Sequence, residues 1–151
     1  MASGVYDYFK KAVMQGSYNL AKTGAGSVWV ALVNNSYVAA FSPSSHDYFG
    51  LFQGTYQISG LAASNYSSGG LALSSPALAE SDANLTGVFT GSNMLWASSS
   101  ITARGAVLYQ SSGLGFFSDP CIAFVDFGAD YSSSAGNFQI TWAANGIMYL
   151  T

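Results

Sequence analysis

The sequence predicts a mainly β protein, an antiparallel β-sandwich or barrel-like fold with one short N-terminal α-helix. Short apolar runs recur along the chain, and Gly, Ser and Asn residues separate them, which is typical of sandwiches and barrels. Four such runs follow one another closely over residues 101–151, the clearest block of strands. A chain of 151 residues fits one domain, so we expect a single domain over residues 1–151.

The first predicted element is an α-helix over residues 3–15. Its apolar residues have the spacing of a helix that packs one face on the rest of the protein: Val5, Tyr8, Phe9, Ala12 and Val13. Ser3 is placed to cap the N-terminus, and Gly16 follows the last turn as a C-terminal stop. A helix this short gains most of its stability from packing, so we expect it to lie on a sheet.

The next elements alternate between strands and loops. After a turn at Gly24-Ala-Gly26, the run Val28–Val33 is apolar on both faces, which predicts a central strand covered on both sides. The run Asp47–Phe52 has the pattern of a helical turn, and Thr55–Ile58 has that of a short strand. Three further short strands are predicted in the middle of the chain, over Leu71–Ala79, Leu85–Thr90 and Met94–Ala97.

The C-terminal strands contain a hairpin signal. Asn145-Gly146 lies between two alternating runs, and this dipeptide favours a two-residue hairpin loop. Such a loop places Ala144 opposite Ile147 and Trp142 opposite Tyr149. One face of the hairpin would then carry its large apolar residues: Phe138, Ile140, Trp142, Ile147 and Tyr149.

Two opposite charges interrupt the apolar C-terminal strands. Arg104 lies in one strand and Asp126 in the next. If Gln110 faces Pro120 in an antiparallel pair, Arg104 faces Asp126. A charge within a strand is costly to bury unless it is paired, so the two residues are predicted to form a structural salt bridge.

The composition excludes several classes of function. Charged residues make up only 7% of the chain, against about 25% in ordinary soluble domains, and the net charge is -3. Only four residues are basic, too few for a surface that binds nucleic acid. No apolar run is long enough to span a membrane, and no secretory signal is expected, because polar residues interrupt the N-terminal stretch. A surface this weakly charged favours contact with other protein.

No residue pattern predicts a catalytic or metal site. His46 lies beside Asp47 in a Ser-rich loop, but nothing marks a nucleophile turn, so a loop histidine is favoured over a general base. Asp82–Gly87 matches the first half of a calcium loop, yet the position for a bidentate Glu holds Asn93, which favours a plain turn. Cys121 is the one cysteine and is predicted to be buried. We expect no enzymatic activity, no metal and no cofactor.

The many aromatic residues leave two alternatives open. They make up 15% of the chain and include Trp29, Trp96 and Trp142. Packing in a core or an interface is the favoured interpretation. Stacking on sugar rings is the alternative, but it also requires converging polar groups that the sequence does not place.

The strand block resembles a group of small virion proteins of tailed bacteriophages. The similarity lies in Thr102–Tyr109, Ile122–Gly128, Gly136–Trp142, Asn145–Ile147 and Leu150-Thr151, and more weakly in the N-terminal helix and Val28–Val33. Residues 34–100 differ and are richer in Ser and Ala. The resemblance implies a structural virion protein, made in the host cytoplasm and located on the capsid surface. A capsid decoration (cement) protein bound to the major capsid protein is expected, with a tail- or fibre-associated, glycan-binding adhesin as the alternative.

Self-association is expected as well. Half of the residues are hydrophobic, and few charges protect the strand edges. A closed ring of identical subunits, such as a trimer, would cover these edges.

Overall fold

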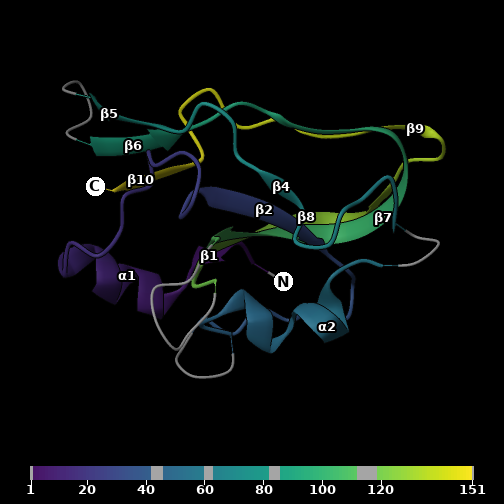
Figure 1. Cartoon of the computed structure of the whole chain (residues 1–151), viewed down its shortest axis with the longest axis horizontal. Helices are drawn as coiled ribbons and strands as arrows, with labels where there is room; N and C mark the ends of the chain where they lie inside the picture. The colour runs from purple at the N-terminus through teal and green to yellow at the C-terminus, as the bar shows by residue number, and fades with distance from the viewer. Residues whose placement is uncertain (1, 42–45, 60–62, 82–85, 112–118, 151) are drawn as a thin grey trace.

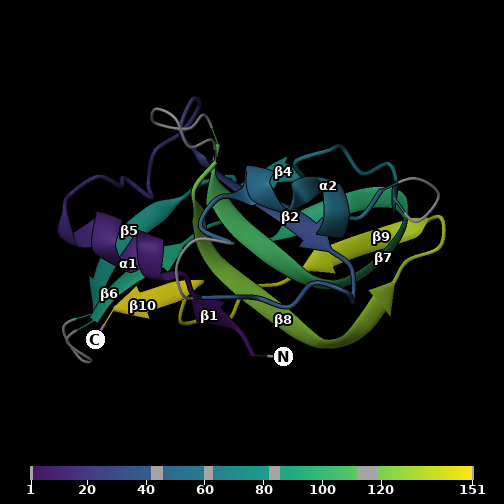
Figure 2. The same cartoon turned by 90° about the horizontal axis from the view of Figure 1, so that it is seen from below.

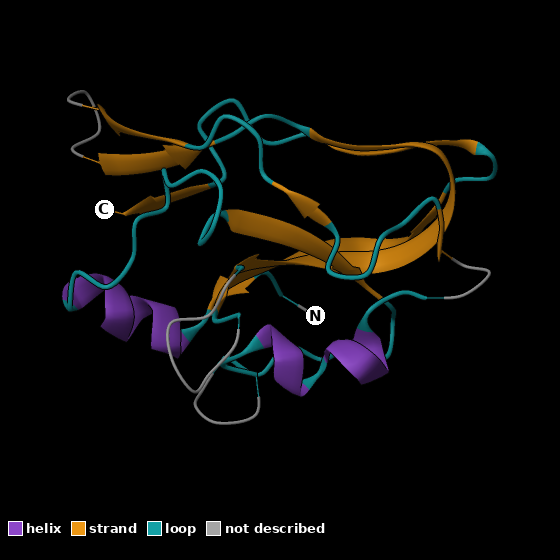
Figure 3. Cartoon of the chain, in the orientation of Figure 1, coloured by secondary structure: helices purple, strands orange, loops and turns teal. Residues whose placement is uncertain are grey.

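The computed structural model describes residues 2–41, 46–59, 63–81, 86–111 and 119–150. Strands make up 48% of the described structure and helices 12%, which confirms the mainly β class with a short N-terminal helix. The described strands form two antiparallel sheets. They build two layers, because the larger sheet bends over at one end and part of it lies in the layer of the smaller sheet (Figure 1). The helices lie on the face of the larger sheet that points away from the smaller sheet (Figure 3).

The larger sheet has the order β1-β8-β7-β2-β4 (Figure 2). The strands β3 and β9 also pair with β7. The bounds of its strands are β1 Gly4–Val5, β2 Val28–Val33, β3 Ala63–Ser64, β4 Leu71–Ala72, β7 Met94–Gln110, β8 Cys121–Ser132 and β9 Gly136–Ile140. The smaller sheet has the order β10-β6-β5. Its strands are β5 Ala77–Ser81, β6 Thr86–Thr90 and β10 Met148–Leu150.

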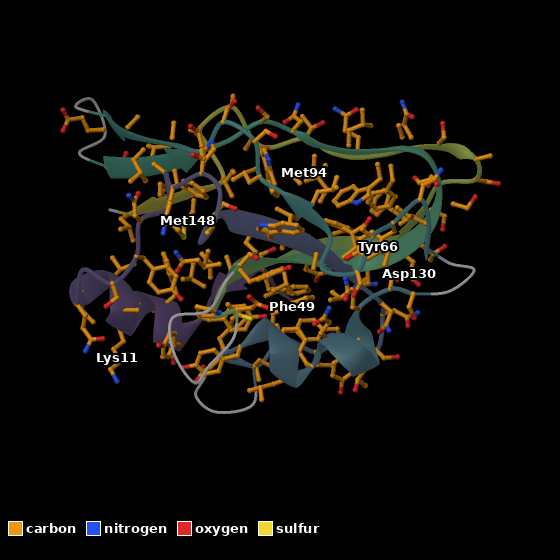
Figure 4. The ribbon with its side chains drawn as sticks, viewed as in Figure 1. Lys11, Phe49, Tyr66, Met94, Asp130 and Met148 are labelled. Atoms are coloured by element: carbon orange, nitrogen blue, oxygen red, sulfur yellow. The ribbon has the colours of Figure 1, made fainter. Side chains whose placement is uncertain are left out.

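The strand β2 is central, as predicted. It pairs with β7 along its whole length and with β4 at Trp29 and Val30. Its two faces contribute to two hydrophobic clusters, one between the sheets and one below the larger sheet. Met94 lies in the first cluster, whereas Phe49 lies in the second, toward α2 (Figure 4). Burial on both faces explains why nearly every residue of β2 is apolar.

The strand β7 joins the two layers. Its first part, from Met94 to Ser99, pairs with β9, and its second part pairs with β8 and β2. Figure 1 shows it bending between the layers. Ser98 adopts a positive φ of 50°, and the fully buried Ser99 donates a hydrogen bond from Oγ to the Trp96 carbonyl (2.9 Å). The prediction that a strand ends at Ala97 is therefore wrong. β7 continues past this residue, because serine hydroxyls supply hydrogen bonds where the pairing with the neighbouring strand is irregular.

The N-terminal helix α1 is shorter than predicted, covering Asp7–Met14. Gly4 and Val5 form β1 instead, paired with the edge of β8. Ser3 does not cap the helix, since its Oγ accepts a hydrogen bond from the backbone N–H of Asp126 (2.9 Å). Gly16 ends the helix with a φ of 68°, as predicted. The backbone groups of Gly4 and Val5 could form either one more helical turn or strand pairing with β8. The strand pairing satisfies these groups equally well, so the helix begins later than predicted.

Two predictions for the middle of the chain are also wrong. The expected strand at Thr55–Ile58 is wrong, because its first half is helical: the short 3-10 helix η1 (Phe49–Leu51) leads into α2 (Gln53–Tyr56), and Gln57 forms an isolated bridge to Val33. The expected strand Leu71–Ala79 is two strands in different sheets, β4 and β5. Between them Ser75 has a positive φ of 50°, which turns the chain from one layer to the other.

The predicted C-terminal hairpin does not form. β9 pairs with β7, and β10 pairs with β6, so the two strands belong to different sheets. A turn is present one residue earlier, where the Gly146 N–H donates to the Ala143 carbonyl (2.9 Å). Tyr149 pairs with Val88 and not with Trp142. The dipeptide therefore marks the turn, but the longer strands β7 and β6 decide the pairing.

Candidate binding groove

A groove of about 560 Å³ opens on one side of the sandwich, between β8 and β9. It is bounded by the outer half of β8, by β9 and by the turn that follows β9. The described residues that line it carry no charge: Val125, Phe127, Tyr131, Ser132, Asn137, Phe138, Gln139, Ile140, Thr141, Trp142, Ala143, Gly146 and Ile147. This groove is the place where the interior of the sandwich reaches the surface, because Val125, Phe127, Trp142 and Ile147 also pack on the core between the sheets.

The path of β8 creates the groove. β8 pairs with β7 at Asp126, opposite Gly105, and next at Tyr131, opposite Ala103. β8 thus advances five residues while β7 advances two, so β8 bulges away from the sheet. Gly128 lies in this bulge with a φ of 80°, a conformation that favours glycine. Among the described strands, β1 pairs with the outer edge of β8 only at residues 123–124, and β9 has β7 as its one neighbour.

Aromatic side chains form the wall of the groove. The Phe127 ring lies 6.2 Å from that of Tyr131 and 6.3 Å from that of Phe138. The indole of Trp142 donates from Nε1 to the Ser92 carbonyl (2.9 Å), which fixes its orientation. These rings are held in place before any ligand arrives, and rigid aromatic groups are favourable contacts in binding sites.

Uncharged polar side chains lie at the rim. Asn137, Gln139 and Thr141 are exposed and alternate with the buried Phe138 and Ile140, which confirms the alternation predicted for this strand. Gln139 donates from Nε2 to the Thr141 hydroxyl (3.4 Å). The rim therefore offers amide and hydroxyl groups around an apolar floor.

The predicted pair of Arg104 and Asp126 is present, on the neighbouring part of β7 and β8. Arg104 Nε lies 3.1 Å from Asp126 Oδ1, and the two side chains are 26% and 5% exposed. The predicted register is wrong by one residue, because Asp126 lies opposite Gly105. Ile122 is an extra residue of β8 with no residue opposite it on β7, and this shifts the later pairs by one position. The long side chain of Arg104 still reaches Asp126 across this shift.

Asp126 is a structural carboxylate. Its Oδ1 also accepts a hydrogen bond from the Gly128 N–H (3.0 Å). This hydrogen bond, followed by the hydrogen bond from Arg104 Nε and the positive charge of Arg104, holds the pKa of Asp126 below its ordinary value of 3.8. The triplet Asp126-Phe-Gly128 is thus a turn within the bulge of β8.

His46 and Cys121 have packing roles. His46 accepts a hydrogen bond at Nδ1 from the Ala40 N–H (3.0 Å), and its ring stacks on Tyr37 at 5.0 Å. Burial lowers the pKa of His46. Cys121 is fully buried, as predicted, and burial raises the pKa of its thiol.

Other candidate features are absent from the described part of the chain. Its His, Cys, Asp and Glu residues form no group of three that could hold a metal ion. The partial calcium motif at residues 82–85 lies outside the described residues. No helix in the described ranges has the length and apolar character to cross a membrane.

The predicted structural residues separate into two groups. Trp142 and Gly146 line the groove, whereas Asn145 lies exposed in the turn and Tyr149 lies on the smaller sheet. Sequence reasoning missed the groove residues of β8, notably Phe127 and Tyr131. Their apolar character predicts a strand, but no signal in the sequence reports that β8 and β9 lie on opposite sides of an opening.

Comparisons with models of protein families, with curated protein sequences and with solved structures find no match to this chain.

Proposed function

We propose that this chain is a non-enzymatic structural virion protein of a tailed bacteriophage, a capsid decoration protein that binds the major capsid protein and stabilises the head. The observation that carries the proposal is a set of large exposed apolar side chains on a chain with only 7% charged residues. Among the residues that the structure describes, eight large apolar ones are each at least 48% exposed: Met14, Val38, Leu51, Leu78, Leu95, Tyr131, Tyr149 and Leu150. The resemblance of β7, β8 and β9 to small virion proteins supports the same role.

The exposed apolar residues lie on several sides of the subunit. Leu78, Tyr149 and Leu150 belong to the smaller sheet, whereas Met14 and Leu51 lie at the helices on the other side of the protein. Protein partners on more than one side would cover these residues, as expected for a subunit that contacts both a capsid and its own copies. The subunit is then made in the host cytoplasm and buried on the virion surface by assembly.

A second function is favoured by the groove. The rings of Tyr131 and Trp142, close to the amides of Asn137 and Gln139, combine stacking surfaces with uncharged hydrogen-bonding groups. This combination suits a neutral sugar, so a tail- or fibre-associated adhesin is the alternative. Binding of the purified protein on a glycan array, lost on replacing Trp142 by Ala, would favour the adhesin.

Self-association is the first test of the structural role. We expect sedimentation of the purified protein at micromolar concentration to show a closed oligomer, with a trimer as the expected form, because association covers the apolar sides of the subunit. High salt should leave the oligomer intact, since few charges are present to be screened. A monomer under these conditions would contradict self-association and leave the capsid as the proposed partner.

A further inference from the structure

We propose that the groove between β8 and β9 binds an extended, uncharged segment of a partner protein, which adds to the sandwich as an extra strand. The proposal rests on the proposed structural role, because it identifies where the subunit holds a neighbouring protein chain. The exposed strand edges, the alternating side chains and the missing charge all lead to this occupant.

The strand edges select a peptide. Beyond Asp126 no described strand pairs with the outer edge of β8, and the described chain leaves the outer edge of β9 without a strand as well. The edge of β9 presents backbone N–H and C=O groups at the spacing of a strand. The edge of β8 is bulged and contributes fewer groups, because the N–H groups of Asp126 and Gly128 already donate to Ser3 Oγ and Asp126 Oδ1. An extended peptide supplies matching groups along its whole length, which is how partners are recognised by strand addition.

The floor of the groove selects apolar side chains at alternate positions. Val125 and Phe127 of β8 and Ile140 of β9 point toward the interior between the sheets. Successive side chains of a strand point to opposite faces, so every second side chain of the incoming segment would lie on this floor. Aliphatic or aromatic residues there exclude water from Phe127 and Ile140, whereas a sugar would bring hydroxyl groups against them.

The missing charge selects an uncharged segment. None of the described lining residues is Asp, Glu, Lys or Arg. A charged side chain entering the groove would lose water without gaining a partner of opposite sign. The polar rim residues Asn137, Gln139 and Thr141 instead suit Ser, Thr or Asn at the outward positions.

The test is a selection from a displayed library of random linear peptides of about eight residues, a common strand length, against the full chain. We expect enriched sequences without charged residues and with apolar residues at alternate positions. A synthetic peptide of the enriched sequence should slow amide hydrogen exchange in β9 and in residues 127–131, because new backbone hydrogen bonds form there.

A matched pair of variants locates the binding. Tyr131 and Tyr149 are both 56% exposed, but only Tyr131 lines the groove. Tyr131→Arg should weaken binding of the synthetic peptide at least about tenfold, whereas Tyr149→Arg should leave it unchanged within about twofold. Because both side chains are exposed, both variants should melt close to the parent protein.

The proposal would be overturned by the absence of any enriched peptide, by enrichment of charged peptides, or by equal weakening of peptide binding in the two arginine variants. Binding of a neutral oligosaccharide such as cellohexaose to the groove, without peptide binding, would also overturn it and favour the adhesin. If the protein decorates phage heads but binds no peptide, the proposed groove is wrong and the proposed structural role stands. The failure of one proposal can therefore be distinguished from the failure of the other.

Discussion

Replacing Gly70 by Ala should destabilise the protein by about 4 kcal/mol, the largest effect expected for so small a change. Gly70 has a φ of 85°, a conformation that costs other residues energy. A Cβ atom there would lie 1.9 Å from the carbonyl oxygen of Val30 and 2.8 Å from the Cα of Ala31. Both atoms belong to the backbone of the central strand β2, so the turn before β4 must move away from the sheet.

Thermal unfolding checks this expectation. About 4 kcal/mol corresponds to a decrease in Tm of about 10 °C for a domain of this size. Gly54→Ala is the matched control, because a Cβ at this helical position meets nothing within 4 Å. It should leave Tm unchanged or slightly raised, since Ala favours helix over Gly. If Gly70→Ala melts within about 2 °C of the parent protein, the close approach to β2 is absent.

The second large effect is expected for Asp126→Asn, at about 1–3 kcal/mol of lost stability near neutral pH. Asn keeps the shape and can still accept the Gly128 N–H, but it lacks the charge that pairs with Arg104. Arg104 would then be left partly buried beside a neutral group. Asp130→Asn is the control on the same strand, since Asp130 is exposed and accepts a hydrogen bond from Asn35. Asp130→Asn should lower the free energy of unfolding by no more than about 0.5 kcal/mol.

The effect of Asp126→Asn should depend on pH. Because the folded protein holds the pKa of Asp126 below its ordinary value of 3.8, the carboxylate contributes its stability fully above that value. The contribution is lost as the pH falls through the folded pKa. Denaturant unfolding should therefore show the difference between parent and variant at neutral pH and a smaller difference in strong acid.

A double replacement separates the charge pair from packing. Arg104→Met with Asp126→Leu removes both charges and keeps much of the apolar volume, so it should recover much of the stability lost by Asp126→Asn. If Asp126→Asn alone unfolds at the same denaturant concentration as the parent, the ion pair contributes no stability.

The sequence is most informative where one local rule decides the structure. The apolar run Val28–Val33 becomes the central strand, because burial on both faces requires that composition. Gly16 ends the helix through its positive φ. The pairing of Arg104 with Asp126 follows from the cost of an isolated charge, which holds even though the register shifts by one residue.

Structure that depends on distant partners is not predictable in the same way. The dipeptide Asn145-Gly146 predicts a turn, but it does not report that β9 and β10 find better partners in β7 and β6. The polar Ser98–Ser100 resembles a loop in the sequence, whereas it bends a continuous strand of 17 residues. The groove arises from both effects, because the bulge of β8 and the separate pairing of β9 leave the side of the sandwich open.

Electron cryomicroscopy of purified virions that carry this protein tests the proposed function most directly. We predict hundreds of copies on each isolated head, placed on the outer face between capsomers. The density of the subunit should fit the sandwich, with apolar residues such as Leu51 or Leu150 against the capsid or a neighbouring copy. A few copies confined to the tail, or no copies on the virion, would contradict the assignment as a capsid decoration protein.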